Sequence, residues 1–501
     1  MRPALRMHEV MLCAALIALS AWLHSVCLPN TDNSWLLFCA QNMLHGATPY
    51  VDFIETNPPL IIYLYAVPVA LAEWLSAPLY PVFIIVLHAL FALVTTSAAH
   101  LTPNPRAWWL ISIVILLVIP ARDFGQREHV FIMLSWPLLT ALLHQRIPTM
   151  THSLAAAIGT AIKPYFMLLW LCTALAHMLN TRRWRPLRQP YLWVIAAVQL
   201  CYLVYLYCIE RHYWQLATSK LAAGYGFYNN PIEDWIAQAG LVPLALIGFY
   251  ALRRTLPLAP LVLLAAWCLA ATFIAVLQMK GFPYHFYPLQ AMLMLSAAWV
   301  YMHAPARMLR ICTLLFALLL VLQPLLGIVR LADGRWDKPH STLAALMHEH
   351  AHGQAVLPLS FDMLFPRHIM QAGATLPYPY AQLWPLVRLY HDAPLDASGM
   401  VQFNSPAQMG HAEKKLFAHI IRSVTQHPPA LIAATDRDYY WYQTDHSLRF
   451  DFIGYLRQSE VFDALMKDYT LVQRVNTHSI DQPHWQSVYV RTTQPPLAPP
   501  K

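Results

Sequence analysis

Charged residues are scarce in this chain: Asp, Glu, Lys and Arg make up 12 % of its 501 residues, whereas 58 % are hydrophobic. Its length would allow two or three soluble domains, but repeated long apolar runs predict a protein that crosses a membrane several times. The net charge of +8 does not indicate nucleic-acid binding, because arginines concentrated in short loops between apolar runs are what membrane orientation requires.

Several motifs are also missing. None of the eight cysteines forms a CxxC pair and most lie inside apolar runs, so neither a zinc site of that type nor a disulfide framework is predicted. No GxGxxG, P-loop or GxSxG sequence occurs. The lack of a nucleotide-binding loop predicts that no nucleotide cofactor is used, as expected for a site outside the cytoplasm, where activated nucleotides are not available.

Eleven apolar runs are predicted to span the membrane. The first follows Arg2 and Arg6 and could pass for a signal peptide, but its length and the later spans favour a retained helix. A further segment, 58–75, contains three prolines and Glu73 and suits a helix lying at the membrane interface. The predicted spans are 10–28, 80–101, 106–120, 130–144, 152–164, 165–180, 190–209, 234–251, 257–278, 284–302 and 310–330.

The distribution of basic residues predicts the orientation. If 58–75 does not cross, the loops on the side of the N-terminus hold Arg106, Arg146, Arg182, Arg183, Arg185, Arg188, Arg253, Arg254, Arg307 and Arg310. The loops on the other side hold Arg122, Arg127, Lys163, Arg211, Lys220 and Lys280. Because cytoplasmic loops carry the excess of Lys and Arg, the N-terminus is expected in the cytoplasm and the C-terminal part outside it.

The predicted first outer loop, residues 29–79, carries Asp32, Asp52 and Glu55. Charges this close to a membrane are costly and tend to be functional. Asp32 has an alternative role as the N-cap of a helix that starts near Ser34. Asp52 and Glu55 could likewise only solvate the loop.

Two further segments on the same predicted side are rich in charge. The sequence RDFGQREH is either an internally paired loop of little energetic value or a site that binds phosphate through arginine. Lys163 interrupts an apolar stretch just before Pro164, where it could extend to the interface or meet an anionic headgroup at a helix break. Lys280 and His285, in QMKGFPYH, pose the same choice.

The apolar runs end near residue 330, and residues 331–495 are predicted to form a small α/β domain outside the membrane. Strands are expected within 355–362 and 429–438, and a helix followed by a strand within 451–475. The Pro-rich tail, 496–501, is predicted to be disordered.

The sequence MHEHAHG in this domain places His348, His350 and His352 at alternate positions. Alternating histidines converge on one face of a strand and could bind a metal. The preceding STLAALM favours a helix, however, where that spacing diverges. A metal site on these three histidines is therefore not the favoured interpretation.

The chain resembles the GT-C membrane glycosyltransferases, in the bacterial branch related to protein O-mannosyltransferases and lipid A aminoarabinose transferases. The resemblance rests on an Asp just after the first span, the GATPYVDF segment, and an NPPL sequence leading into 58–75, and it extends to about residue 330. Many relatives have a second acid where Asn33 stands, and the aminoarabinose-transferring relatives have a lysine where Asn57 stands. Aminoarabinose is therefore not the expected sugar.

This resemblance implies an all-α polytopic GT-C fold with about eleven transmembrane helices over residues 1–330, in the bacterial inner membrane. It also implies transfer of a sugar, with inversion, from a polyprenyl-phosphate donor to a lipid, glycan or protein acceptor during cell-envelope assembly. Asp32 matches the family's catalytic carboxylate and would deprotonate the acceptor hydroxyl. The cations available for the donor phosphate are Arg122, Arg127, Lys163 and Lys280.

The remaining polar residues of these loops are assigned supporting roles. Asp123 and Glu128 could hold those cations or a divalent metal, and Asp52, Glu55 and His285 could contact the metal or the acceptor. The competing functions are a flippase or transporter of lipid-linked sugars, and a polymerase or ligase that uses the same substrates. A transporter should place polar groups near the middle of broken helices, whereas these charges gather on one predicted face, which favours an enzyme.

Overall fold

The computed structural model describes residues 7–26, 30–218, 239–278, 280–332, 341–360, 365–390, 393–435, 449–476 and 485–492. The chain divides into two compact units. Unit 1 consists of Met1–Asn30, Asn57–Trp214 and Asn229–Asp333, and unit 2 of Thr31–Thr56, Gln215–Tyr228 and Gly334–Lys501.

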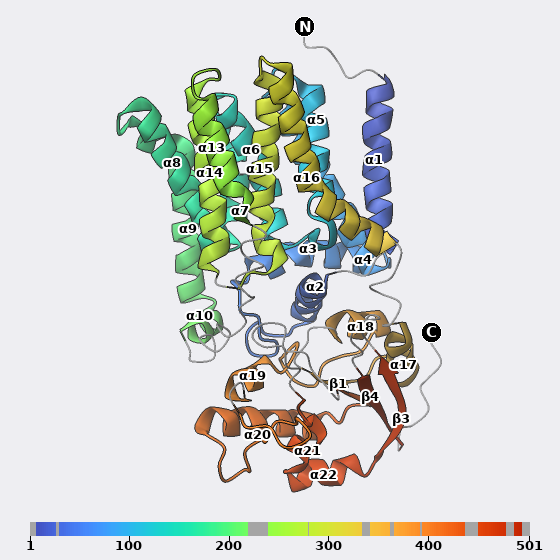
Figure 1. The fold of residues 1–501 in the computed structure, drawn as a ribbon. Helices are drawn as coiled ribbons and strands as arrows, with labels where there is room; N and C mark the ends of the chain where they lie inside the picture. Colours follow the sequence, from blue (N-terminus) through green and yellow to red (C-terminus); the bar gives the residue numbers. More distant parts are fainter. Residues whose placement is uncertain are drawn as a thin grey trace. The chain divides into compact units, whose positions relative to one another are not determined.

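Unit 1 is a bundle of helices that lie side by side (Figure 1). A helix overlaps each of the eleven predicted apolar runs, because long runs dominated by apolar residues favour helix once packed. These helices are α1 (Met7–Val26), α4 (Leu79–Ala99), α5 (Pro105–Ile113), α6 (Arg127–Leu143), α7 (Met150–Ala161), α8 (Met167–Thr181), α9 (Pro190–Cys208), α13 (Leu241–Leu252), α14 (Leu258–Leu277), α15 (Tyr287–His303) and α16 (Arg307–Ala332).

Shorter elements connect these helices. They are α3 (Leu60–Trp74), the π-helical turn η1 (Val114–Val118), the 3-10 turns η2 (Ala121–Asp123), η3 (Pro164–Phe166), η4 (Arg185–Arg188) and η6 (Pro283–Phe286), and α10 (Arg211–Ala217) at the division between the units. The amide of Leu60 donates to the hydroxyl of Tyr202 on α9 at 3.0 Å, which fixes the start of α3. The interfacial position of α3 remains a prediction.

Four helices within the described part of the chain are long and apolar enough to cross a membrane: α4, α9, α14 and the Arg307–Leu326 part of α16. The other helices of the bundle are shorter or less apolar. The structure therefore confirms a mostly helical fold with membrane-length helices, whereas the count of eleven crossings remains a prediction.

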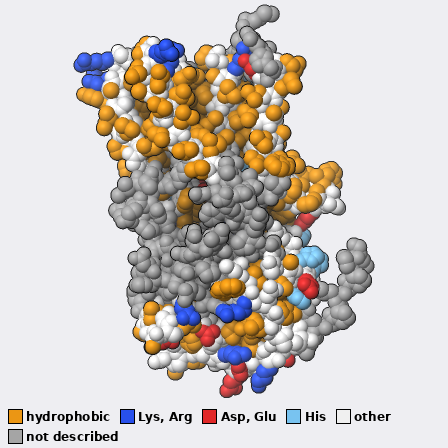
Figure 2. All heavy atoms as spheres, turned by 45° about the vertical axis from the view of Figure 1, so that its right-hand side comes forward, with side chains coloured by type: hydrophobic (Ala, Val, Ile, Leu, Met, Phe, Trp, Pro, Cys, Tyr) orange, Lys and Arg blue, Asp and Glu red, His pale blue; other side chains and the backbone are white. Residues whose placement is uncertain are grey.

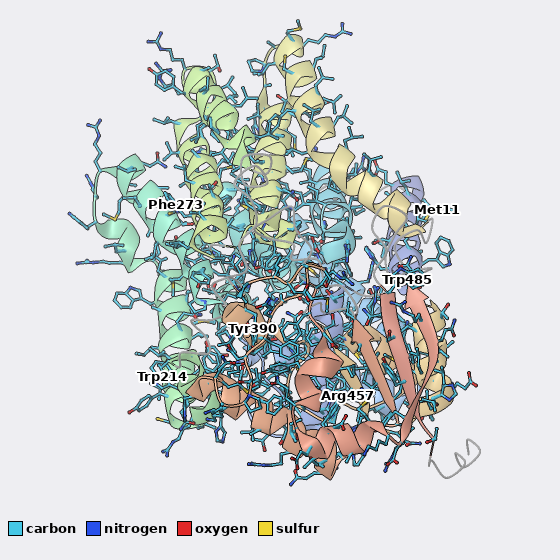
Figure 3. All side chains as sticks on the ribbon, turned by 60° about the horizontal axis from the view of Figure 1, so that its bottom comes forward. Met11, Trp214, Phe273, Tyr390, Arg457 and Trp485 are labelled. Atoms are coloured by element: carbon cyan, nitrogen blue, oxygen red, sulfur yellow. The ribbon has the colours of Figure 1, made fainter. Side chains whose placement is uncertain are left out.

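The outer surface of the bundle is apolar. Leu200 on α9 and Leu319 on α16 are 63 % and 62 % exposed, and Phe273 on α14 points outward (Figure 3). The visible face of the bundle is almost entirely hydrophobic, with Lys and Arg at its upper end (Figure 2). Exposed apolar surface of this extent suits a lipid environment.

We call that end of unit 1 the arginine-rich end. It is formed by the loops α4–α5, α6–α7, α8–α9, α13–α14 and α15–α16, whose exposed arginines include Arg146, Arg182, Arg183, Arg188, Arg254, Arg307 and Arg310. The opposite end is formed by η2, η3 and η6, so Arg122, Lys163 and Lys280 lie at the other end of the bundle from the arginine-rich end.

Unit 2 contains a four-stranded sheet in the order β1-β2-β4-β3, with β1 parallel to β2 and the other pairs antiparallel. Pro358 lies in the edge strand β1, where a missing N–H is tolerated. The elements are α2 (Thr31–Leu44), α17 (Ser341–Ala351), β1 (Val356–Leu359), α18 (Phe365–Ala372), α19 (Trp384–Tyr390), α20 (His411–Gln426), β2 (Leu431–Thr435), α21 (Phe452–Arg457), α22 (Glu460–Met466), β3 (Tyr469–Asn476) and β4 (Trp485–Arg491). The expected strands β1, β2 and β3 are confirmed, whereas β4 was not predicted.

Residues 31–56, part of the predicted first outer loop, group with the C-terminal residues in unit 2. The helix α2 packs on α18, and the amide of Ile54 donates to the carbonyl of Pro379 at 2.7 Å. The segment that carries Asp32 is therefore built together with the C-terminal part of the chain.

The orientation of the bundle can be tested with two reporter fusions. A reporter inserted after Arg188, at the arginine-rich end, should report a cytoplasmic location, and one fused after Thr492 should report an extracytoplasmic location, because positive loops are retained inside. Paired alkaline phosphatase and fluorescent-protein fusions measure both. The opposite pair of locations would contradict the predicted orientation.

Candidate functional site

A buried ion pair lies at the end of unit 1 opposite the arginine-rich end. The ammonium of Lys163 is 2.6 Å from Oε1 of Glu128, and the two side chains are 5 % and 0 % exposed. The same ammonium donates to Oε1 of Gln278 at 2.7 Å. Lys163 therefore does not extend to a solvated surface, and that alternative is wrong.

Local sequence explains how these groups meet. Pro164 disfavours helix at the preceding residue, and Lys163 accordingly has an extended backbone (φ −142°, ψ 135°) between α7 and η3. Glu128 is the second residue of α6, and Gln278 directly follows α14. The pair therefore joins the ends of three helices.

Arg127 and the residues around η6 surround this pair. The guanidinium of Arg127 and the ammonium of Lys163 lie 5.9 Å and 5.6 Å from the centre of the Tyr284 ring, at the outer limit of a cation–π contact. His285 is 2 % exposed and its ring lies 4.4 Å from that of Tyr284, edge to face. Arg127 itself is 4 % exposed.

The electrostatic environment of this region is positive. The charges of Lys163, Arg127 and Lys280 all act on His285, which is buried among them. Oε2 of Glu128 and Nδ1 of His285 are buried and have no hydrogen-bond partner among the residues that the structure describes. Such atoms usually mark a place where water or a ligand binds.

We call this group the Lys163 cluster; it consists of Arg127, Glu128, Lys163, Lys280 and His285. The structure brings these five predicted residues together. It also adds Gln278 and Tyr284, which sequence reasoning missed. The only sequence signal for Gln278 is that this glutamine ends an apolar run and stands two residues before Lys280.

The loop that leads into α6 is shaped by Gly125 and His129. Gly125 has φ +89°, and a Cβ there would lie 2.8 Å from the Phe83 ring, so only glycine fits. The amide of Gly125 donates to Nδ1 of His129 at 2.8 Å, and Nε2–H of His129 consequently donates to the carbonyl of Leu116 at 2.8 Å. This arrangement fixes the first turn of α6, and with it Arg127 and Glu128.

Asp123 and Arg122 lie beside this loop. Asn30, two residues after the first predicted span, donates to Oδ1 of Asp123 at 2.9 Å and accepts from Nε2 of Gln126 at 2.8 Å. Arg122 is exposed. Glu128 bonds to Lys163, outside the sequence RDFGQREH, so the interpretation as an internally paired loop does not hold for this acid.

The three carboxylates of the first outer loop belong to unit 2, whereas the Lys163 cluster belongs to unit 1. Asp32 is the second residue of α2 and is partly exposed; the expected helix start near Ser34 is therefore wrong, and Asp32 lies inside the first turn, where its charge favours the helix dipole. Asp52 is exposed and accepts from the amide of Thr48 at 2.7 Å, as in a solvated turn. Glu55 is 5 % exposed.

Metal ligation can be judged only for the described residues. Among them, no three His, Cys, Asp or Glu side chains lie close enough together to hold a metal ion. In the Lys163 cluster, Oε1 of Glu128 is bonded to an ammonium, and in the adjoining loop Oδ1 of Asp123 accepts from an amide. These two acids are therefore arranged to hold cations and amides of the protein.

No protein-family model matches the chain, and neither does any curated protein. Its structure is similar to that of ArnT from Cupriavidus metallidurans bound to undecaprenyl phosphate, with a TM-score of 0.52, 11 % identity, and 98 % of each chain covered. This similarity shows that the chain shares the overall fold of that ArnT. For the apo state of the same ArnT, the TM-score is 0.44 and the identity 13 %, over 96 % of this chain and 97 % of that one.

The energetics of the buried pair give a first prediction. Lys163→Met leaves the Glu128 carboxylate buried without its ammonium, which should lower the free energy of unfolding by about 3–5 kcal/mol. The double variant Lys163→Met/Glu128→Gln removes both charges and should recover most of that loss. Thermal unfolding of the purified protein in detergent measures both. A double variant as unstable as Lys163→Met would show that the pair is not what holds the helix ends.

Proposed function

We propose that this protein is a membrane glycosyltransferase that transfers a sugar from a polyprenyl-phosphate donor to a lipid, glycan or protein acceptor. The observation that carries the proposal is the Lys163 cluster: buried cations grouped at one end of an apolar helix bundle. The fold supports it, since the ArnT of similar structure was solved with undecaprenyl phosphate. The cluster has the charge and the place that a lipid-linked phosphate requires.

The donor phosphate is assigned to the Lys163 cluster. Arg127 offers a planar fork suited to two phosphate oxygens, and it is the first residue of α6, whose N-terminal amides also favour an anion. Lys163 adds a point charge that is aimed by Glu128 and Gln278. Lys280 and the exposed Arg122 add positive charge at the rim. A leaving phosphate is stabilised by cations that are already in place and excluded from water.

The transfer step is assigned to Asp32. Its carboxylate takes the proton of the acceptor hydroxyl, the acceptor oxygen bonds to the anomeric carbon of the sugar, and the bond from that carbon to the phosphate oxygen breaks. The polyprenyl phosphate leaves with the bonding electrons and is stabilised by the cluster. A single displacement of this kind inverts the anomeric carbon, and it needs one carboxylate as base.

A divalent metal is not given a step in this mechanism; Glu128 is assigned to holding Lys163, and Asp123 to holding Asn30. Glu55, buried on the loop that carries Asp32, and His285, buried among the cations, are assigned to contacts with the acceptor and the donor. Asp52 is assigned to the turn that it stabilises. No nucleotide cofactor is required, since the donor carries its own activating phosphate.

The proposed location is the bacterial inner membrane, with eleven crossings and the arginine-rich end in the cytoplasm. In that orientation the Lys163 cluster faces the outer side, where lipid-linked sugars are used during cell-envelope assembly. The C-terminal residues, including the β1–β4 sheet, then lie outside the cytoplasm.

The main alternative is a flippase or transporter of lipid-linked sugars. Transporters place substrate groups near the middle of interrupted helices, whereas Arg127 begins α6, Lys163 follows α7 and Lys280 follows α14. This placement at helix ends favours the enzyme. A polymerase or ligase that uses the same donors differs in its acceptor, and the acceptor assay below distinguishes it.

The sharpest test of the catalytic base is Asp32→Asn. The amide is nearly isosteric with the carboxylate but cannot accept the proton, so we expect transfer to fall about 100-fold or more. In a deletion strain, the wild-type gene should clear the accumulated lipid-linked sugar and the Asp32→Asn gene should not, at equal membrane abundance. Mass spectrometry of extracted lipids and of the glycosylated products gives the readout and identifies the acceptor.

Asp52→Asn is the matched control, because Asp52 lies on the same loop and its turn contact can be kept by an amide oxygen. It should clear the lipid-linked sugar like the wild type. If Asp32→Asn cleared the lipid-linked sugar at the wild-type rate, Asp32 would not be the base. Its role would then be to stabilise the first turn of α2 through the helix dipole.

Donor binding can be tested separately from transfer. Undecaprenyl phosphate should bind the purified protein, and the charge-neutral double variant Lys163→Met/Glu128→Gln should bind it about 10-fold to 100-fold more weakly, the scale of one charged hydrogen bond of about 1.5–3 kcal/mol. Arg183→Gln, at the arginine-rich end, is the control and should bind normally. Equal binding of undecaprenyl phosphate by all three proteins would show that the phosphate does not bind at the Lys163 cluster.

A further inference from the structure

The end of helix α17 in unit 2 and the residue directly after it form the sequence His348-Glu349-His350-Ala351-His352, in which the first and last histidines are four residues apart. The structure confirms the expected helix over Ser341–Ala351. Residues four apart lie on the same face of a helix, whereas alternate histidines diverge. The pair that matters is therefore His348 and His352, not the alternating set that the sequence first suggests.

The two imidazoles are already close together. Their ring centres are 5.1 Å apart and their planes are inclined by 35°, and both residues are exposed. Figure 2 shows exposed histidine side chains gathered beside an acidic one at the level of α17. A pair of imidazoles at this spacing can share one metal ion with little rearrangement.

The orientation of His352 is fixed by the backbone of the neighbouring helix. Its Nδ1 lies 2.7 Å from the carbonyl of Ala372, the last residue of α18. A carbonyl can only accept, so Nδ1 carries the hydrogen and Nε2 of the neutral ring has its lone pair available. Metal-ligating histidines almost always donate their other N–H to a carbonyl or carboxylate in this way.

Gly373 completes this support. It has φ +63°, and a Cβ at this position would lie 3.0 Å from Cε1 and Nδ1 of His352. The absence of a side chain lets the imidazole rest against the backbone just beyond α18. The backbone of Ala372 and Gly373 thus supports the Nδ1 side of the ring, and Nε2 remains available to a ligand.

The sequence matches the HExxH pattern of zinc peptidases, which needs a third protein ligand and a glutamate that acts as base. The side chain of Glu349 is 70 % exposed and lies 3.8 Å from Nε2 of His350, on the diverging side of the helix. No third His, Cys, Asp or Glu completes a set in the described ranges. The geometry therefore fits metal binding and does not fit peptide hydrolysis.

We propose that His348 and His352 form a two-histidine site for a borderline divalent metal ion such as Zn²⁺ or Ni²⁺, with water in the remaining coordination positions. Imidazole nitrogen is a preferred ligand of these ions. Because His352 is bonded to the end of α18, a bound ion fastens α17 against α18. This site is separate from the Lys163 cluster and does not depend on the proposed glycosyl transfer.

The test uses the full-length protein in detergent, purified with a tag that contains no histidine and stripped of metal. Zn²⁺ binding is measured by calorimetry, and bound zinc by elemental analysis after dialysis. The wild type should show one saturable site for Zn²⁺. In His348→Ala and in His352→Ala the affinity of that site should fall at least about tenfold, because loss of a group that only orients a metal ligand already lowers metal affinity by this factor.

His350→Ala is the matched control, because it removes a histidine from the same turn of α17 on the diverging side, and it should keep the site. Thermal unfolding provides a second readout: Zn²⁺ should raise the midpoint of the wild type and of His350→Ala, but not that of His348→Ala, because a ligand stabilises only the state that binds it. If His348→Ala is less stable than the wild type in the presence of a chelator, His348→Asn replaces it in the binding and unfolding measurements. Equal loss of binding in His350→Ala, or no zinc site sensitive to His348 and His352, would overturn the proposal.

Discussion

The buried contact between Lys163 and Glu128 is the interaction on which the charged end of the helix bundle depends. Removing an ammonium and a carboxylate from water costs several kcal/mol for each ion, so they are stable only when they meet with good geometry. Their distance of 2.6 Å, together with the amide of Gln278, meets that condition. The consequence is that α6, α7 and α14 must end at the same level, and that Arg127 is brought beside the pair.

Much of this fold could be predicted from the sequence because apolar runs and prolines act locally. The runs gave the positions of the long helices, and Pro164 marked the break at which Lys163 leaves α7. The partner of Lys163 could not be predicted in the same way. Glu128 is 35 residues away and Gln278 is 115 residues away, and an amide at the end of an apolar run gives no indication of what it will contact.

The errors in the sequence interpretation also have physical causes. The start of α2 was expected near Ser34, since Asp32 is a good N-cap, but the helix begins at Thr31 and uses the carboxylate inside its first turn, where the helix dipole also favours it. The strand β4 was missed because Trp485–Arg491 lacks the continuous apolar run that marks β1 and β2, since Gln486 and Ser487 interrupt it. The histidines of α17 were considered at a spacing of two, whereas a helix brings together residues four apart.

The packing of α2 against α18 has a consequence for the order in which the chain can be completed. These helices are separated by the 320 residues between Leu44 and Phe365, so the ribosome reaches α18 about 16–64 s after it finishes α2, at about 5–20 residues per second. Throughout that interval α2, which is buried from Asn33 to Ala40 in the finished fold, lacks its contact with α18. A nascent chain of this protein should therefore need a chaperone or the membrane surface to shield that apolar face, and a chain cut short before α18 should be an early target for proteases.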